Sequence, residues 1–138
     1  MVEMYCGGSE QRARILIGAA VMAAMKGKNV LFVSFGRDYS DCDRLFEISQ
    51  HITLLNPGIN SAREYFDSAV RMAITFKYNV LILDDILGAA ERGCIPEAQV
   101  LEFLSDAPDS IEIICAGEKA YPRFLRLADK AVGLSYLK

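Results

Sequence analysis

The chain has 138 residues, 52% of them apolar and 24% charged, and a formal net charge of −3. A chain of this size and composition can bury the core of one domain, which we expect to span residues 1–138. The negative net charge argues against general nucleic-acid binding, and no apolar run is long enough to span a membrane.

Strand and helix patterns alternate from end to end. In chain order we expect strand 2–6, helix 10–26, strand 29–35, helix 40–49, strand 52–55, helix 61–77, strand 79–83, helices 86–92 and 96–105, strand 111–115, helix 121–130 and strand 132–136. This alternation predicts an α/β fold with a mostly parallel sheet. We also expect Ser9 to cap the first helix, 56–58 to form a turn, and Met22, Met25 and Met72 to lie in the core.

The N-terminus lacks the basic and apolar regions of a signal peptide, so none is expected. The four cysteines (Cys6, Cys42, Cys94 and Cys115) are far apart in the sequence, and three of them stand among apolar residues. Reduced, mostly buried thiols and a cytoplasmic location are the expectation. With only one histidine, we expect no structural metal site.

The first strand-to-helix turn is similar to a phosphate-binding loop, G-x-x-x-x-G-K-[ST]. With Gly7 as the first glycine and a loop one residue shorter than the motif, Gln11 takes the place of the second glycine, Arg12 of the lysine and Ala13 of the hydroxyl. A helix N-terminus would still offer free amides and a positive dipole end to a phosphate. The residues predicted to bind nucleotide or phosphate are Gly7, Gly8, Ser9, Gln11, Arg12, Ala13 and Arg14.

The side chains of this turn weaken that prediction. Ala13 cannot ligate a metal, and Glu10 places a negative charge where a phosphate would lie. Each lost charge-assisted hydrogen bond removes roughly 1.5–3 kcal/mol, or about ten- to a hundredfold in affinity. A tight turn carrying solvated arginines explains the spacing equally well.

Two acids, Asp84 and Asp85, follow the apolar run at 80–83. Such a strand can present a carboxylate that orients Mg²⁺, so we predict a catalytic role for both acids and Mg²⁺ binding by Asp84. The alternative is that they cap the following helix. Ser34, Arg37 and Asp38 follow another strand at the expected ligand-binding edge of the sheet, although a plain polar loop is the favoured interpretation there.

The chain resembles the ATP:corrinoid adenosyltransferases of the CobA/CobO/BtuR type across nearly its whole length. The similar stretches are 5–35, 80–86, 93–96, 113–117 and 128–132, with Ala90, Val100, Leu101, Pro122 and Leu125 at matching spacing. The resemblance implies a three-layer, RecA-like P-loop fold and a homodimer. It also implies transfer of the 5′-deoxyadenosyl group of ATP to the cobalt of a reduced corrinoid, with Mg²⁺ as cofactor.

The sequence departs from this family at the polar positions. Arg12 stands in place of the family's lysine, and Ala13 and Arg14 stand in place of its pair of hydroxyl residues. The family's Thr-Gly-Arg is replaced by residues 116–118, which end in Glu118. Two hypotheses therefore stand. The chain is either an adenosyltransferase with an unusual site, or a catalytically impaired relative that binds a nucleotide, an anion, a corrinoid or a protein partner without turnover.

Overall fold

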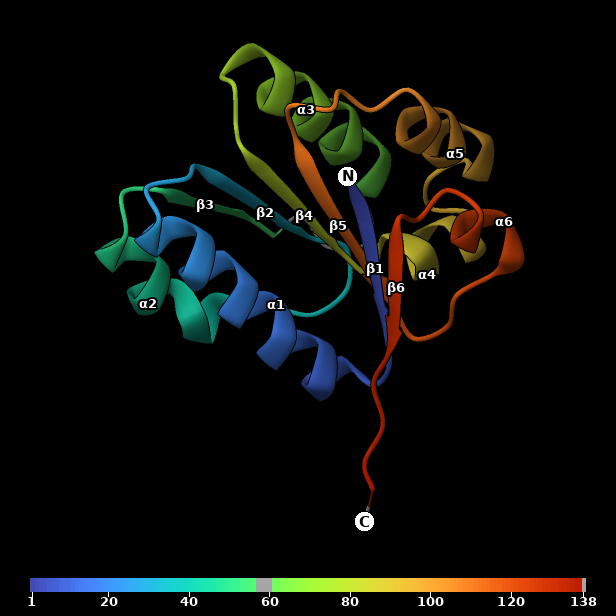
Figure 1. The fold of residues 1–138 in the computed structure, drawn as a ribbon, viewed down its shortest axis with the longest axis horizontal. Coiled ribbons are helices and arrows are strands. Elements are labelled where there is room, and N and C mark those ends of the chain that lie inside the picture. The colour runs from blue at the N-terminus through green and yellow to red at the C-terminus, as the bar shows by residue number, and fades with distance from the viewer. Residues whose placement is uncertain (57–60, 138) are drawn as a thin grey trace.

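The structure is a computed structural model that describes residues 1–56 and 61–137 (Figure 1). Its elements are β1 (Val2–Cys6), α1 (Ser9–Met25), β2 (Val30–Ser34), η1 (Ser40–Cys42), α2 (Asp43–Ile48), β3 (Ile52–Leu55), α3 (Ala62–Thr75), β4 (Val80–Asp84), α4 (Ile86–Glu91), α5 (Glu97–Ser105), β5 (Glu112–Gly117), α6 (Pro122–Leu125) and β6 (Lys130–Gly133). The turn expected at 56–58 falls mostly on residues outside the described part.

The six strands form one sheet in the order β3-β2-β4-β5-β1-β6, and every adjacent pair is parallel. Helices α1 and α2 cover one face, and α3, α4, α5 and α6 lie on the other, which gives three layers (Figure 1). Every residue of β2 and β4 is buried, as their continuous apolar runs predicted. The predicted α/β fold with a parallel sheet is confirmed.

The carboxyl ends of β1, β2 and β4 meet at one edge of the sheet. Strand β5 lies between β1 and β4, and Ser34 is the register partner of Asp84. The core is divided by the sheet into an α1 side, with Phe32, Ile82 and Ile114, and an opposite side that contains Leu31 and Leu81. The three strand ends singled out from the sequence therefore lie at the same edge of the sheet.

The C-terminal elements differ from the expectation. Helix α6 ends at Leu125 instead of 130, and β6 begins at Lys130 instead of 132. The reason is Asp129, whose carboxylate accepts a hydrogen bond from the Val2 amide and whose own amide donates to the Val2 carbonyl, both at 2.7 Å. This pairing draws the chain into the sheet before a longer helix can form.

Three predictions about side chains were wrong. Ser9 is the first residue of α1 and makes no capping bond, because Gly8 takes the cap position. Met22 and Met25 are exposed rather than in the core. Of the four cysteines, only Cys115 is buried, and the other three are half-buried.

Within residues 1–56 and 61–137, none of the helices is both long and apolar enough to cross a membrane.

Candidate functional site

The turn between β1 and α1 is short. Strand β1 ends at Cys6 and α1 begins at Ser9, so only Gly7 and Gly8 separate them. Glu10 and Gln11, which the motif placed in the phosphate loop, therefore lie in the first turn of α1. The backbone that would wrap a phosphate is wound into a helix instead.

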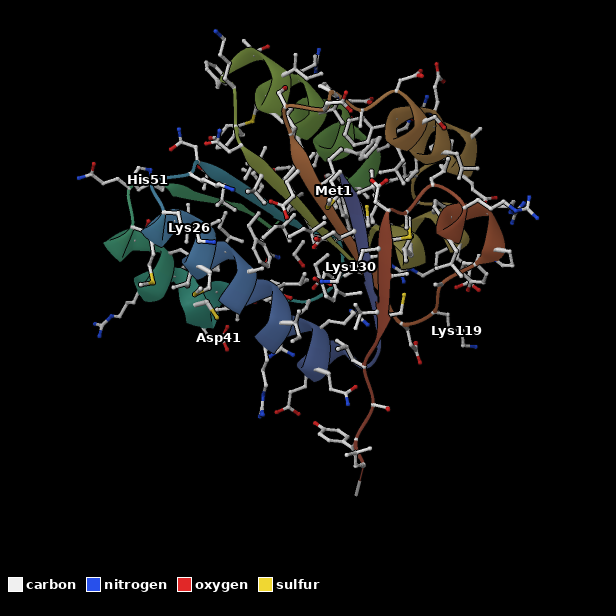
Figure 2. The ribbon with its side chains drawn as sticks, in the orientation of Figure 1. Met1, Lys26, Asp41, His51, Lys119 and Lys130 are labelled. Atoms are coloured by element: carbon white, nitrogen blue, oxygen red, sulfur yellow. The ribbon has the colours of Figure 1, made fainter. Side chains whose placement is uncertain are left out.

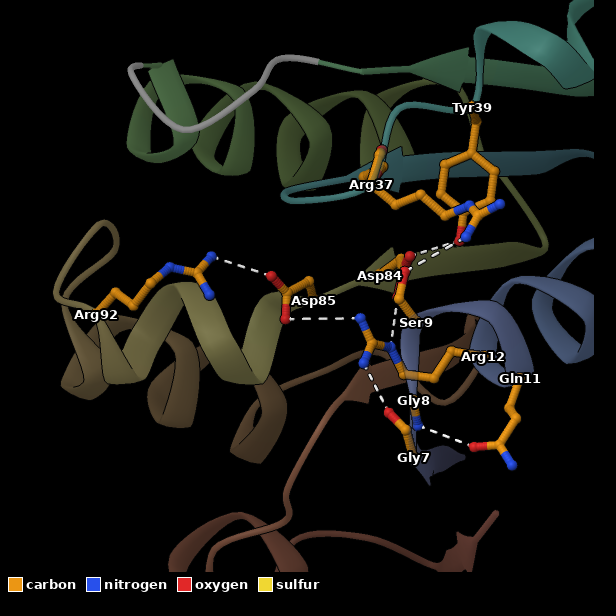
Figure 3. A network of polar contacts seen from close by, with 11 residues as sticks. Gly7, Gly8, Ser9, Gln11, Arg12, Arg37, Tyr39, Asp84, Asp85 and Arg92 are labelled. Atoms are coloured by element: carbon orange, nitrogen blue, oxygen red, sulfur yellow. Dashed lines mark hydrogen bonds and ion pairs between the residues drawn. The ribbon is translucent and has the colours of Figure 1, made fainter. Parts of the chain in front are cut away.

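The polar groups of both glycines already have partners within the chain. The Gly7 amide donates to the Gly117 carbonyl at 3.1 Å. The Gly8 amide donates to Oε1 of Gln11 at 3.0 Å (Figure 3). A side chain on Gly7 would lie 2.8 Å from the Cβ of Leu134, so the strand end needs glycine for packing. Both glycine amides of this turn are therefore already hydrogen-bonded within the chain.

Arg12 points into the protein. Its side chain is only 7% exposed, and its Nη1 donates to the Gly7 carbonyl at 2.7 Å. Its Nε donates to Oδ1 of Asp84 at 3.3 Å, and its Nη2 lies 3.9 Å from Oδ1 of Asp85. The positive charge that the motif assigns to phosphate binding is therefore turned toward the two acids (Figure 3).

Asp84 is fully buried at the end of β4, and both of its oxygens have donors. Arg12 bonds to Oδ1, and the Tyr39 hydroxyl donates to Oδ2 at 2.5 Å. Burial raises the pKa of the Asp84 carboxyl, and the Tyr39 and Arg12 contacts partly oppose that rise. The ionised carboxylate thus depends on these two donors.

Asp85 adopts a left-handed backbone, with φ of 61°, at the start of α4. Its Oδ2 accepts a hydrogen bond from Nη2 of Arg92 at 3.0 Å, and it makes no capping bond to the helix. A Cβ on Gly36 would lie 2.6 Å from Oδ2, so the close approach of this loop requires glycine there. Asp85 is thus held between Arg92 and the more distant Arg12.

The remaining predicted residues lie outside this network. Arg14 is exposed and pairs with Glu10 at 2.9 Å, so that arginine is solvated as the alternative interpretation had it. Ala13 is buried. Nη1 of Arg37 lies 3.4 Å from the Ser9 hydroxyl, and Glu118 is exposed.

Tyr39 was missed from the sequence. It follows β2 in a loop without a periodic pattern, yet it is fully buried, and its ring packs against Phe32 at 4.9 Å between centroids. Burial and the neighbouring Asp84 raise the pKa of its hydroxyl, so Tyr39 remains a hydrogen-bond donor. Its role depends on a contact with a strand 45 residues away, which local sequence does not reveal.

Replacing Tyr39 with phenylalanine tests this contact. The change leaves one buried Asp84 oxygen without a donor, so we expect the free energy of unfolding to fall by about 1–3 kcal/mol. Urea denaturation followed by circular dichroism measures it. Tyr65→Phe, at an exposed tyrosine of α3, is the matched control and should change stability by less than about 0.5 kcal/mol. Equal effects of the two variants would contradict the assigned contact.

The residues present do not fit Mg²⁺–ATP as they stand. Asp84, the predicted metal ligand, has both oxygens engaged, and Ala13 supplies no hydroxyl. A cavity of about 100 Å³ beside Asp85, Gly88 and Arg92 is smaller than the roughly 300 Å³ at which ligand pockets begin. Among the described residues, no three acids, cysteines or histidines are grouped to hold a metal.

Comparison with known proteins decides the family. Residues 1–138 match the ATP:corrinoid adenosyltransferase family BtuR/CobO/CobP. The chain belongs to this family. The corrinoid adenosyltransferase scaffold is therefore present over the whole sequence, while the polar groups at its phosphate loop bind one another.

A solved structure supports the fold. The chain is similar to EssC (ATPases 2 and 3) from Geobacillus thermodenitrificans, with a TM-score of 0.55 and 8% sequence identity. The match covers 96% of this chain and 31% of that chain, so this chain spans under a third of the EssC structure. At this identity the likeness concerns the fold alone. No curated protein matched the sequence.

Proposed function

We propose that this member of the corrinoid adenosyltransferase family does not transfer the 5′-deoxyadenosyl group, and that it acts as a binding protein without turnover. The observation that carries the proposal is that Arg12 and Tyr39 occupy both carboxylate oxygens of Asp84. We call this arrangement the closed site. Family membership points to a corrinoid as the ligand that such a protein would retain. The expectations of a cytoplasmic location and of a single domain remain part of this proposal.

The closed site opposes Mg²⁺–ATP binding for two physical reasons. A metal at Asp84 would have to displace a buried guanidinium from a carboxylate, and the freed Arg12 would then need a new partner. An incoming triphosphate would also have to displace the Gln11 side chain from the Gly8 amide. Each exchange removes an existing bond before a new one forms, which lowers the net affinity.

Thermal unfolding with and without Mg²⁺–ATP tests the proposal. A ligand at a hundred times its dissociation constant adds about 2.7 kcal/mol of stability. We expect no shift of the melting temperature at millimolar Mg²⁺–ATP. The matched variant Gln11→Gly/Arg12→Lys/Ala13→Thr supplies the Gly-Lys-Thr end of the loop motif, and we expect it to be stabilised by the same ligand. A shift in the unmodified protein would contradict the proposal.

The second candidate is an active adenosyltransferase, which the full-length family match favours. In that case Arg12 would leave Asp84 when ATP arrives, Asp84 and Asp85 would orient Mg²⁺, and Gly7, Gly8, Ser9, Gln11, Arg12, Ala13 and Arg14 would contact the phosphates. These assignments stay predictions. Adenosylated product formed from ATP and reduced cobalamin would establish this candidate. Cobalamin binding without product would support the first.

A further inference from the structure

Helices α3 and α5 lie on the same face of the sheet and leave a groove between them (Figure 1). Its volume is about 550 Å³, within the roughly 300–1,000 Å³ of ligand-binding pockets. Phe66, Val70 and Phe103 line it with apolar surface, and the rings of Phe66 and Phe103 meet edge-on at 5.7 Å between centroids. We call this cavity the α3–α5 groove. None of the residues that line it belongs to the closed site.

Apolar surface continues past one end of the groove. An adjoining cavity of about 440 Å³ shares Ile74 and Pro108 with it and extends to Asn79 and Ile111, just before β4 and β5. Ile74 is 52% exposed, so an apolar side chain faces solvent where the two cavities meet. The charged residue that lines the adjoining cavity is Lys77. Contiguous apolar surface of this kind marks an interaction site.

The charged residues of the α3–α5 groove are mostly acidic. Asp67 lies on α3, Glu102 lies on α5, and Asp106 directly follows α5, one helical turn after Glu102. Arg71 is the cation among the residues that line the groove. In the described part of the chain none of these four residues forms an ion pair, and Asp67 accepts a hydrogen bond from Gln99 instead.

The two acids of α5 add to the negative end of their own helix. Cations stabilise the C-terminal end of a helix, yet α5 has no basic residue in its last turn and carries Glu102 and Asp106 there. Lysines labelled in Figure 2 lie elsewhere, because Lys26 follows α1 on the other face of the sheet and Lys119 follows β5 at the carboxyl edge. A cation supplied from outside the chain would therefore be stabilised at this end of the groove.

We propose that the α3–α5 groove binds a short amphipathic helix of another protein, with its apolar side chains in the groove and two cations, one turn apart, beside Glu102 and Asp106. The distance along α3 from Phe66 to Ile74 is about 12 Å, which matches two turns of a bound helix. Helices bind such grooves through apolar residues at three- and four-residue spacing. Basic residues one turn apart lie on one face of the helix, so both can face the two acids. This inference is independent of the proposed function.

The size of the groove sets the expected strength of binding. A contact of two helical turns buries less than the roughly 1,200 Å² of a stable complex, so the interaction is transient. Glu102 and Asp106 are exposed, and salt screens exposed charges. We therefore expect a dissociation constant in the high micromolar range that rises with salt concentration.

Titration of the ¹⁵N-labelled protein with a designed peptide, followed by NMR, tests the proposal. The probe is an amidated peptide of about twelve residues with leucines along one helical face and two lysines, one turn apart, beside them. A control peptide carries glutamates in place of the lysines. We expect the lysine peptide to shift the amide signals of Val70, Ile74 and Phe103 and to bind at least about tenfold more tightly than the control. No binding at millimolar peptide, equal affinity of the two peptides, or shifts confined to other residues would overturn the proposal.

Two pairs of substitutions locate the contacts. Ile74→Lys should weaken binding of the lysine peptide at least about tenfold, whereas Ile15→Lys, at a 40% exposed isoleucine of α1, should leave it unchanged. Both isoleucines are exposed, so both variants should fold. Glu102→Gln/Asp106→Asn should also weaken binding about tenfold and remove most of its salt dependence. Equal effects of Ile74→Lys and Ile15→Lys, or an unchanged salt dependence in the double variant, would contradict the assigned contacts and overturn the proposal.

Two further measurements distinguish other occupants of the groove. Phenethylamine offers an aromatic ring and an ammonium group without a helix, and we expect it to bind more weakly than the lysine peptide. If it shifts the same amide signals at lower concentration, the groove is a small-molecule site. If those signals shift with protein concentration alone, a second copy of the chain occupies the groove. Either result overturns the proposal.

Discussion

Replacing Arg12 with methionine will lower the free energy of unfolding by about 3–5 kcal/mol, because the change leaves Asp84 buried without its cation. Methionine fills similar volume, so the effect reports the lost charge more than a cavity. Arg14→Met is the matched control two residues away. Arg14 is exposed, and its pair with Glu10 is worth at most about 0.5 kcal/mol.

The pH dependence of the Arg12→Met variant gives an independent check. Burial raises the folded-state pKa of Asp84 above its unfolded value, and loss of Arg12 removes one of the contacts that oppose this rise. Between the two values the folded state binds more protons, so stability increases as the pH falls through the folded-state pKa. The deficit relative to the unmodified protein should therefore shrink toward acid pH. A deficit independent of pH would contradict the assignment.

Replacing both members of the ion pair will cost much less than replacing one. In Arg12→Met/Asp84→Leu no buried charge is left alone, and exchanging a buried pair for apolar side chains is often neutral or stabilising. We expect the double variant to recover about 2–4 kcal/mol relative to Arg12→Met. The Tyr39 hydroxyl would lose its acceptor, so Tyr39→Phe in the same background should recover further stability.

The comparison must use a full double-mutant cycle by urea denaturation. Asp84→Leu alone isolates a buried guanidinium and should be destabilised by an amount similar to that of Arg12→Met. If the two single effects on the free energy of unfolding simply add in the double variant, the two side chains do not interact. That result would contradict the Arg12–Asp84 contact and the closed site built on it.

The fold was predictable because each element carries a local pattern. The continuous apolar runs at 30–33 and 80–83 predicted buried parallel strands, and the rule on carboxyl ends placed Asp84 at the same edge as Gly7. The direction of Arg12 had a weaker signal. It stands four residues before Leu16, so it continues the buried stripe of Leu16, Ala20 and Ala24 toward the sheet.

Other features were not available from local pattern. Tyr39 reaches Asp84 through the path of a loop, which depends on the finished sheet. The early start of α1 depends on Gln11 occupying the Gly8 amide, a contact that motif spacing does not encode. The exposure of Met22 and Met25 was missed because α1 is apolar on every side from Ile15 to Met25, so its periodicity there does not define one buried face.

The most direct test of the closed site is an NMR measurement of the Arg12 Nε–H group in the ¹⁵N-labelled protein. A guanidinium buried against Asp84 should give a slowly exchanging Nε–H signal, and Arg12→Met identifies that signal by removing it. We predict that the signal keeps its position and its slow exchange when millimolar Mg²⁺–ATP is added. A signal that shifts or exchanges rapidly on addition of Mg²⁺–ATP would show that Arg12 leaves Asp84 for the nucleotide, and would contradict the account.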